Sequence, residues 1–573
     1  MEKIRKLRKL LNKHNLDGYL IGKNDEYFEE YIAQNNERLK FITNFSGSYG
    51  FALILKKKLF LFVDGRYSLQ AKIQSGKLFN IVTIPKNYPG DILKNKNFTI
   101  GYDPKLYTKS MLSNLFKRSK AKLISVDVNL VDKIWKRKLN SISNKFYKLK
   151  DNETGQKSQK KIQLLSKIIN KRNIDFQFIT SSENISWLLN LRSKNSEFTP
   201  IIKGYALISK AGKITFFCEK NKINVKLEKK LKNILIIDIK YIDKFLNKLK
   251  NKNIQIDVNS CSIYFEKLIE KNNKIIQKKD SIYFIKSIKN KTEVKNIIKS
   301  HEYDGAALTK FLIWLKKNFK NKKISEIDAE KKLLKFRKEI KTFKSLSFPT
   351  ISGAGPNSAI IHYKANKKSN RILKKGELYL VDSGGQYNFG TTDVTRTISL
   401  ENKQNKIKDI FTRVLKGHIA VSNFQIKKNT CGSDIDLVAR KYLKEKGLDY
   451  AHGTGHGVGY FSNVHEGPQS ISKGSKQRFY EGMVTSNEPG YYKNGKFGIR
   501  IENLVLVKRI NKLNKFETLT LAPIDKTLIN KILLSDEEIK WLDKYHSRVY
   551  QTLNKHMNKS EKKDLKNLCS NIQ

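Results

Sequence analysis

Residues 378–400, LYLVDSGGQYNFGTTDVTRTISL, decide the fold of the C-terminal half of the chain. Two runs rich in β-branched and aromatic residues flank a glycine-rich middle, which predicts two strands joined by a turn. Asp382 ends the first predicted strand and Asp393 opens the second. Across such a hairpin the two carboxylates can face one another.

Two further carboxylates follow in strand-like settings. Glu488 lies in TSNEPGYY, where Pro489 stops the strand. In residues 498–507, GIRIENLVLV, the alternation of apolar and polar positions predicts one strand that carries Arg500 and Glu502 on the same face.

The motif HGTGHGVG at residues 452–459 has the spacing of a helical zinc-ligand pair, but it is not predicted to be a helix. Its four glycines disfavour a helix, and the glutamate that follows the first histidine in zincins is absent. We therefore predict a loop in which one of His452 and His456 binds a metal and the other makes hydrogen bonds.

The distribution of lysine supports a cation site. Lys and Arg fill 114 of the 573 positions, yet both are absent from residues 376–395, 447–472 and 479–492, and residues 345–363 carry no charge of either sign. A lysine beside a divalent cation would raise the local potential and compete for carboxylates. Burial alone could also exclude lysine, but these segments are rich in polar residues.

The net charge of +61 raises the alternative of nucleic-acid binding. Residues 341–510 carry 28 Lys and Arg and 13 Asp and Glu, a net of +15 that is close to the chain-wide density. No basic stripe or aromatic-interleaved basic motif is present. The charge is therefore interpreted as compositional drift, and no specific nucleic acid is expected as a partner.

Length and pattern predict three domains, at residues 1–150, 151–290 and 291–573. Helical spacing predicts a helix at residues 2–13 and one or two helices at 292–319, with short strands at 51–55 and 59–63 and a polar linker at 151–161. The stretches that begin at Asp17 and Asp175 echo one another, which predicts two related α/β domains. Residues 535–573 are helical in pattern and could pack on the core or on a partner subunit.

The remaining features predict a cytoplasmic protein. Four scattered cysteines form no CxxC pair, the N-terminus lacks the apolar core of a secretory signal, and no apolar run is long enough to cross a membrane.

Five motifs in order resemble the Xaa-Pro aminopeptidases, in the long three-domain form of the pita-bread metallopeptidases. The motifs are SFPTISGAGPNSAIIHY (347–363), LVDSGGQYNFGTTDVTRT (380–397), HGTGHGVGYFSNVHEGP (452–468), TSNEPGYY (485–492) and FGIRIENLVLV (497–507). VDGRYSLQA at 63–71 and ENISWLLNLR at 183–192 extend the resemblance. It implies a mixed α/β (α+β) fold, with two creatinase-like N-terminal domains followed by a pita-bread catalytic domain.

The resemblance also implies roles for individual residues. The implied metal ligands, called the acidic cluster below, are Asp382, Asp393, His456, Glu488 and Glu502. Glu488 is also implied to move protons, and His362 and His465 to bind substrate and stabilise the transition state. His452, Arg66 and Arg500 are implied to act on the substrate side, with Arg66 reaching the substrate across a dimer and Arg500 orienting a carboxylate.

Four carboxylates and one imidazole suit two divalent ions about 3.5–4 Å apart, bridged by a hydroxide that would attack the peptide bond. Oxygen-rich ligation favours Mn²⁺, with Zn²⁺ and Co²⁺ as alternatives. The expected substrates are peptides with proline at position 2, and the expected assembly is a homodimer. A prolidase-type dipeptidase, a methionine aminopeptidase and a non-catalytic peptide-binding module are the alternatives.

Overall fold

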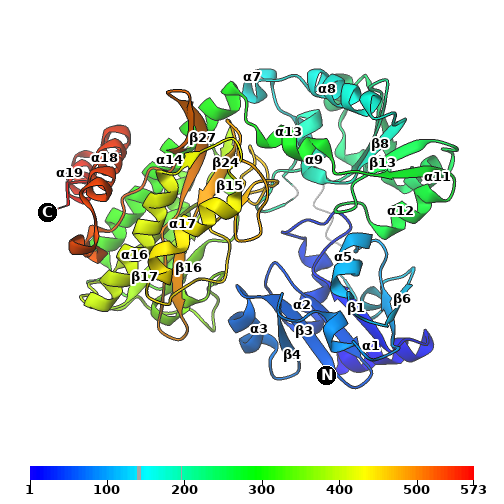
Figure 1. The fold of residues 1–573 in the computed structure, drawn as a ribbon, viewed down its shortest axis with the longest axis horizontal. Helices are drawn as coiled ribbons and strands as arrows, with labels where there is room; N and C mark the ends of the chain where they lie inside the picture. Colours follow the sequence, from blue (N-terminus) through cyan, green and yellow to red (C-terminus); the bar gives the residue numbers. More distant parts are fainter. Residues whose placement is uncertain (138–143, 195, 573) are drawn as a thin grey trace. The chain divides into compact units, whose positions relative to one another are not determined.

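The computed structural model describes residues 1–137, 144–194 and 196–572, and the chain divides into two compact units. The first unit holds Met1–Ser196 and Pro200–Ile282, and the second holds Glu197–Thr199 and Tyr283–Gln573. Both units mix helices with strands, as Figure 1 shows. Within the described ranges, no helix has the length and apolar character needed to cross a bilayer.

The first unit contains two six-stranded mixed sheets with the same architecture, in the order β4-β3-β2-β1-β5-β6 and β12-β11-β10-β8-β13-β14. In each sheet the first strand along the chain pairs antiparallel with one neighbour and parallel with the other. The strands are Gly18–Gly22 (β1), Phe51–Leu55 (β2), Leu59–Asp64 (β3), Asn80–Ile84 (β4), Thr99–Tyr102 (β5), Lys122–Ser125 (β6), Phe176–Ile179 (β8), Tyr205–Ser209 (β10), Ile214–Cys218 (β11), Ile234–Asp238 (β12), Asn253–Ile256 (β13) and Lys274–Gln277 (β14), with a separate pair at Tyr147–Lys148 (β7) and Leu191–Arg192 (β9). The shared order confirms the prediction of two related α/β domains.

The two sheets also share a side-chain arrangement at the start of the first strand. The Asp17 carboxylate accepts a hydrogen bond from the Thr99 amide and lies 3.3 Å from Lys56 Nζ. Asp175 accepts in the same way from the Asn253 amide and lies 2.9 Å from a lysine, Lys210. The sequence echo at these two aspartates therefore corresponds to a repeated structural unit.

Helices cover these two sheets, and two of them occupy a predicted linker. The first helix, Glu2–Lys13 (α1), has the predicted bounds and buries Ile4, Leu7 and Leu11. The stretch 151–161 is not a linker, because it forms Asp151–Thr154 (α7) and the start of Ser158–Lys171 (α8). The other helices are Arg38–Thr43 (α2), Ser68–Ser75 (α3), Pro89–Ile92 (α4), Lys109–Leu115 (α5), Leu130–Ile134 (α6), Ser182–Leu189 (α9), Val225–Lys230 (α10), Ile242–Asn247 (α11) and Ile263–Glu270 (α12).

The second unit begins with the end of Ser281–Ser287 (α13) and with Lys291–Asn318 (α14). The one or two helices predicted at 292–319 are therefore a single long helix. Asn290 caps α14 through the amides of Thr292 and Glu293. The other helices are Glu326–Lys338 (α15), Asn405–Ser422 (α16), Gly432–Lys444 (α17), Asp536–Leu553 (α18) and Lys559–Leu568 (α19). α18 and α19 lie beside α14, at the red end of the chain in Figure 1.

The strands of the second unit form five small sheets rather than one large sheet. They are Phe343–Leu346 (β15), Ile351–Ala354 (β16), Leu378–Ser383 (β17), Gly385–Tyr387 (β18), Gly390–Thr391 (β19), Val394–Ser399 (β20), Gln425–Ile426 (β21), Gly455–His456 (β22), Ser470–Ile471 (β23), Val484–Asn487 (β24), Gly490–Lys493 (β25), Phe497–Arg500 (β26), Asn503–Ile510 (β27) and Leu513–Thr518 (β28).

Two strand predictions in this unit were wrong in detail. The glycine-rich middle of residues 378–400 is not a simple turn but a second hairpin, β18–β19, which pairs with β15. Gly384 permits it, since a Cβ there would lie 1.9 Å from the carbonyl oxygen of Thr392. The predicted single strand 498–507 is broken into β26 and β27, because β26 pairs with β25 and β27 with β24.

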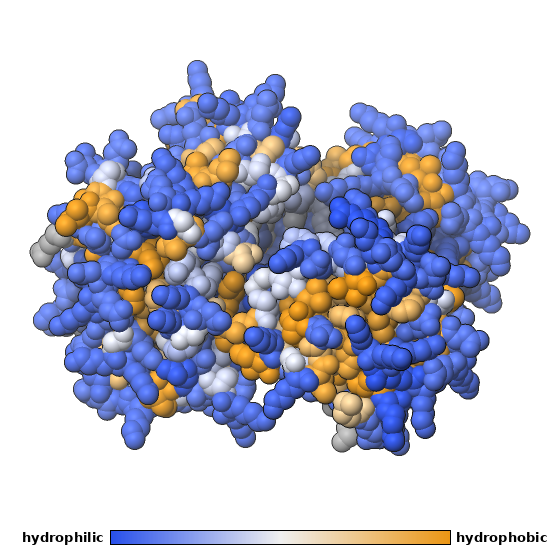
Figure 2. Space-filling view, turned by 60° about the horizontal axis from the view of Figure 1, so that its bottom comes forward, coloured by the Kyte–Doolittle hydropathy of each residue, from blue (hydrophilic) through white to orange (hydrophobic). Residues whose placement is uncertain are grey.

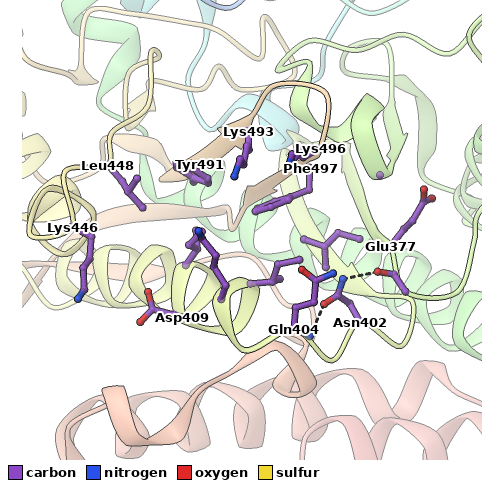
Figure 3. A pocket seen from close by; sticks show the side chains of 16 residues that line it. Glu377, Asn402, Gln404, Asp409, Lys446, Leu448, Tyr491, Lys493, Lys496 and Phe497 are labelled. Carbon is purple, nitrogen blue, oxygen red and sulfur yellow. Dashed lines mark hydrogen bonds between the residues drawn. The ribbon is translucent and has the colours of Figure 1, made fainter.

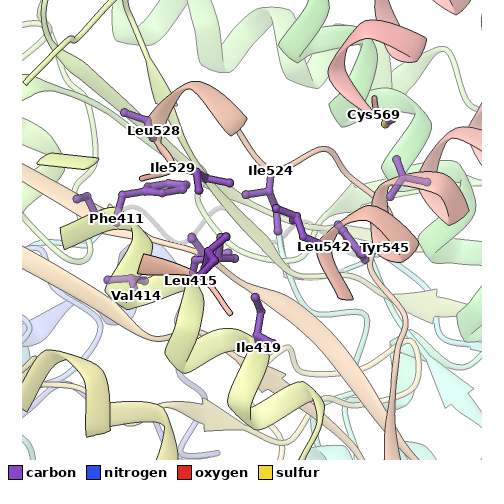
Figure 4. Close-up of a cluster of buried hydrophobic side chains, with 14 of the residues drawn as sticks. Phe411, Val414, Leu415, Ile419, Ile524, Leu528, Ile529, Leu542, Tyr545 and Cys569 are labelled. Atoms are coloured by element: carbon purple, nitrogen blue, oxygen red, sulfur yellow. The ribbon is translucent and has the colours of Figure 1, made fainter. Parts of the chain in front are cut away.

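An apolar cluster ties the C-terminal helices to this unit. Leu542 and Tyr545 of α18 belong to the same cluster of buried side chains as Phe411 and Leu415 of α16, which Figure 4 shows. The helices α18 and α19 therefore pack on the core of their own unit, and residue 573 of the predicted range lies outside the described residues. Figure 2 shows hydrophilic residues over most of one face of the molecule, with smaller hydrophobic areas between them.

Candidate metal centre

The five residues of the acidic cluster come from five places in the second unit. Asp382 lies in β17, Asp393 immediately precedes β20, and His456 ends β22. Glu488 follows β24 directly, and Glu502 lies in the break between β26 and β27. Strand ends therefore supply every member, and the break that the sequence did not predict is what places Glu502.

These side chains converge in space. One ligand atom each from Asp393, His456 and Glu502 lie within 4.8 Å of one another. His456 Nε2 is 3.5 Å from Asp393 Oδ2 and 3.6 Å from Glu488 Oε1. Asp382 is close enough for its charge to raise the pKa values of both Asp393 and Glu502.

Burial and mutual repulsion dominate the electrostatics of the acidic cluster. The pKa of Asp393 is raised to about 6, first by burial and then by the charges of Asp382 and Glu488. A hydrogen bond from His456 lowers this pKa but does not outweigh burial. Burial and the neighbouring carboxylates likewise raise the pKa of Glu502 well above its usual range. For His456, burial lowers the pKa, but the Asp393 hydrogen bond and the Glu488 charge outweigh it and raise the pKa to about 9.

The donor set fits divalent cations. Asp382 Oδ1 and Asp393 Oδ1 are buried and accept no hydrogen bond from any part of the chain that the structure describes. Buried carboxylate oxygens normally have partners, and hard oxygen donors are the ligands of divalent cations. Cations between these carboxylates would remove both the repulsion and the missing partners.

Arg500 holds Asp382 in place from inside the protein. Its Nη2 donates to Asp382 Oδ2 at 2.6 Å, its Nη1 to the Tyr492 hydroxyl at 2.6 Å and its Nε to Thr395 Oγ1 at 3.1 Å. Arg500 is only 1 % exposed. Its contacts are with the chain itself, which fits a residue that orients a ligand.

Three supporting residues were missed by the sequence reasoning. Thr395 donates to Glu502 Oε2 at 2.7 Å, and Ser486 donates to Glu488 Oε1 at 3.2 Å. Thr395 lies two residues after Asp393, so strand alternation could have indicated it. His418 Nδ1 of α16 donates to the Asn487 carbonyl, and its Nε2 accepts from the Asn503 side-chain amide. Asn487 and Asn503 are next to the candidate ligands Glu488 and Glu502, but no motif in the sequence surrounds His418.

The glycine-rich histidine loop is not helical, as predicted. A Cβ on Gly455 would lie 2.0 Å from the carbonyl oxygen of Ser486, and one on Gly457 would lie 2.1 Å from that of Glu466. The glycines are therefore required by close backbone approach. His452 Nε2 is 2.9 Å from the Tyr492 hydroxyl, and its Nδ1 is 3.9 Å from Glu488 Oε2.

The remaining predicted residues are His465 and His362 in the second unit and Arg66 in the first. The ring of His465 stands edge-on to that of His456, with centroids 4.3 Å apart. His362 follows Ile361, whose carbonyl accepts from Arg500 at 3.4 Å. Arg66 belongs to the first unit, where its Nη2 lies 2.6 Å from Asp64 Oδ2.

A separate cavity of about 840 Å³ contains no member of the acidic cluster. Tyr491, Lys493 and Phe497 of the β25–β26 hairpin line it, together with residues of α16, as Figure 3 shows. Tyr492, one position along β25, contacts Arg500 and His452 instead. Because strand neighbours point to opposite faces, the hairpin separates this cavity from the acidic cluster.

Family comparisons cover almost the whole chain. Residues 295–509 match the metallopeptidase family M24, and 512–572 match the C-terminal region of that peptidase. Residues 3–134 and 117–293 each match a creatinase/prolidase N-terminal domain.

Individual relatives agree with these matches. The chain is 37% identical over 577 residues to a probable Xaa-Pro aminopeptidase P from Laccaria bicolor, covering 96% of this chain and 90% of the relative. It is 34% identical to Xaa-Pro aminopeptidase 1 from Dictyostelium discoideum, covering 96% and 92%. The crystal structure of an X-prolyl aminopeptidase from Caenorhabditis elegans, described as a cytosolic enzyme with a di-nuclear active site, aligns with a TM-score of 0.94 at 30% identity, covering 100% and 99%.

Proposed function

Because this chain belongs to the Xaa-Pro aminopeptidases of metallopeptidase family M24, we propose that its acidic cluster is the centre that removes the first residue of peptides with proline second. The observation that carries the proposal is the convergence of Asp393, His456 and Glu502 beside two buried carboxylate oxygens that accept no hydrogen bond from the described part of the chain. The alternative of a non-catalytic peptide-binding module is disfavoured, because such a module would not need to keep all five residues of the acidic cluster.

The acidic cluster would hold two divalent cations, which lower the pKa of water and so supply a nucleophile near neutral pH. We propose that Asp382, Asp393, His456, Glu488 and Glu502 would together hold these cations. The oxygen-rich donors favour Mn²⁺, with Zn²⁺ and Co²⁺ as alternatives.

Glu488 is the proposed proton carrier. Its side chain is 18 % exposed, more than those of Asp393 and Glu502, so it faces the accessible side of the acidic cluster. A general base must lie within hydrogen-bond reach of the water that it activates. We propose that Glu488 takes the proton from the attacking water and delivers it to the proline nitrogen as that amine leaves.

His465 and His362 are proposed to bind the substrate around the scissile carbonyl. Both are partly exposed, and imidazole N–H donors aimed at the carbonyl oxygen would stabilise the negative charge that develops there. The proline amide has no N–H and a fixed φ, so a site shaped for that ring can select it. Arg500 and His452 are proposed to position the reacting groups, and Arg66 to contact the substrate.

The test is hydrolysis of an Arg-Pro-Pro peptide by protein reloaded with Mn²⁺. We expect release of free arginine, and loss of both activity and one or more bound metal ions in Asp393→Asn. Asp525→Asn, which removes a buried carboxylate that pairs with Lys316 elsewhere in the unit, is the matched control and should keep both. Absence of arginine release by fully metallated protein would refute the proposal.

The substrate panel also separates the neighbouring activities. Cleavage of Arg-Pro but not of Arg-Pro-Pro would indicate a prolidase, and cleavage of a Met-Ala peptide would indicate a methionine aminopeptidase. Metal binding without any hydrolysis would indicate the peptide-binding module.

We further propose a cytoplasmic homodimer. The cytoplasm is supported by the description of the nematode relative as cytosolic. Sedimentation equilibrium should then give twice the chain mass of 66.4 kDa.

A further inference from the structure

A buried group of ion pairs connects the beginning of the second unit to residues 456–466. This segment begins at His456 and includes His465, and it is called the histidine loop below. It consists of Glu466, Lys286 and Lys289, called the buried triad below. Lys286 Nζ lies 2.8 Å from Glu466 Oε2, and Lys289 Nζ lies 3.7 Å from Glu466 Oε1. The side chains are 4 %, 1 % and 1 % exposed, respectively.

Burying these charges is costly, so their presence needs a reason. The effective penalty is several kcal/mol per ion, and apolar replacements of buried pairs are often neutral or stabilising. Burial lowers the pKa of Lys289, whereas the two lysines outweigh burial and lower the pKa of Glu466. Stability alone is therefore a weak explanation for the buried triad.

Glu466 lies at the end of the histidine loop, directly after His465. Its amide donates to the Gly457 carbonyl at 2.8 Å, and the Gly457 amide donates to the Gln469 carbonyl at 3.0 Å. The bond between Glu466 and Gly457 joins the residues that directly follow His465 and His456. The rings of these two histidines are in contact. A shift of Glu466 would therefore move the two rings relative to one another.

The loop has no room for Glu466 to move toward it. A Cβ on Gly457 would lie 2.1 Å from the Glu466 carbonyl oxygen, and one on Gly459 would lie 2.6 Å from Glu466 Oε2. The glycines pack against Glu466 on one side, and the two lysines hold its carboxylate on the other.

The lysines are themselves fixed to the frame of the site. The Lys289 amide donates to the Gly482 carbonyl at 2.9 Å, and Ile288 forms a bridge with Met483. Met483 leads directly into β24, which ends beside Glu488. One rigid segment therefore anchors both the histidine loop and the strand that carries the proposed proton carrier.

We propose that the buried triad is a positioning group: Glu466, held by Lys286 and Lys289, fixes His465 against His456 without touching substrate or metal. This inference rests on the proposed function. It predicts that the triad controls turnover and metal affinity, and not only the stability of the fold.

The experiment compares three variants with wild type. Glu466→Gln keeps the shape and removes the charge. The double variant Lys286→Met with Glu466→Leu replaces the closest pair by apolar side chains, while Lys289 keeps Glu293 as a neighbouring opposite charge. Glu538→Gln is the matched control, because it removes an ion pair with Lys416 on α16 and α18, away from the histidine loop. The readouts are kcat and KM for Arg-Pro-Pro at saturating Mn²⁺, Mn²⁺ affinity by calorimetry, and Tm.

We expect Glu466→Gln to lose about 10–100-fold in kcat and about 10-fold in Mn²⁺ affinity, the range seen when groups behind metal ligands are removed. The double variant should recover a Tm close to that of wild type and keep the low kcat. Glu538→Gln should lower Tm and leave kcat and Mn²⁺ affinity unchanged. If Glu466→Gln does not fold, kcat and Mn²⁺ affinity of the double variant are compared with those of wild type. Lys289→Met, which removes only the more distant lysine, is then measured as a less disruptive variant.

A double variant with wild-type kcat and Mn²⁺ affinity would overturn the inference, because the ions would then serve stability alone. So would a folded Glu466→Gln variant with wild-type values. If wild type releases no arginine, the proposed function fails, whereas the Mn²⁺ affinities of the variants still decide the role of the triad.

Discussion

At the scale of single residues, the acidic cluster depends on neutral hydroxyls that link its charged members. Thr395 donates to Glu502 and accepts from Arg500, which in turn donates to Asp382. Hydrogen bonds to charged groups are stronger than neutral ones, and they fix the orientation of a ligand before a metal binds. Thr395 therefore connects a central carboxylate to one at the edge.

Thr395→Val tests this link, since it keeps the β-branched shape and removes the hydroxyl. We expect a fall of about 10–100-fold in Mn²⁺ affinity, measured by calorimetry, because Glu502 and Arg500 lose their common partner. Thr397→Val is the matched control: its hydroxyl lies two residues along the same strand and bonds only the backbone of Arg500. The control should lower Tm but not metal affinity, and equal losses of affinity in both variants would refute the role of Thr395.

At the scale of elements, long helices hold the short strands in register. His418 places α16 against Asn487 and Asn503, which face one another across β24 and β27. The C-terminal helices are held to α14 partly by Glu302, which lies 2.7 Å from His556 Nε2 and 2.9 Å from Lys555 Nζ. The framework around the acidic cluster is therefore closed by contacts between elements far apart in sequence.

The Glu302 contact should make the stability of this framework depend on pH. Burial alone would raise the pKa of Glu302, but hydrogen bonds from Lys555, His556 and Lys299 lower it to about 2. A lowered carboxyl pKa stabilises the folded state above the ordinary value near 4.5, and this stabilisation is lost as the pH falls toward 2. Glu302→Gln should therefore lower Tm by about 2–4 °C at pH 7, and the difference from wild type should shrink below about pH 4.5.

The control for this prediction is Glu2→Gln, which removes an exposed pair with Lys6 on α1. Exposed pairs contribute little, so its Tm should match that of wild type at each pH. A Glu302→Gln difference that stays constant down to pH 2.5 would contradict the assigned cause.

At the scale of the whole molecule, two properties have different origins. The repeated six-stranded sheets of the first unit, with matching aspartates at Asp17 and Asp175, reflect a shared architecture. The net charge of +61 is shared by 114 Lys and Arg against 53 Asp and Glu along the whole sequence. We interpret the strong charge as a property of the composition, as the sequence predicted, and this interpretation remains a prediction.

This interpretation predicts weak, non-specific binding to nucleic acid. Fluorescence anisotropy with a duplex DNA should give a dissociation constant above about 1 μM at 150 mM salt, the range of non-specific electrostatic binding. An arginine-release assay with added DNA should show no change. Submicromolar affinity with a steep dependence on salt would instead support a nucleic-acid partner.

The sequence by itself determined the chemical parts of this protein. The α1 and α14 helices follow from local apolar spacing, and the non-helical histidine loop follows from its glycines. The candidate ligands could be named because carboxylates and a histidine occur in ordered motifs free of lysine. These features depend on neighbours within a few residues along the chain, which is the range that a pattern records.

Only the tertiary structure decided how those parts are held. The β18–β19 hairpin, the break before Glu502 and the helices at residues 151–161 differ from the local prediction because each depends on partners chosen at long range. The contacts of Thr395, His418 and the buried triad could not be read from the sequence for the same reason, although Thr395 and Glu466 lie inside quoted motifs. Hydrogen bonds and buried charges are fixed by proximity in space, and sequence spacing does not specify that proximity until the chain has folded.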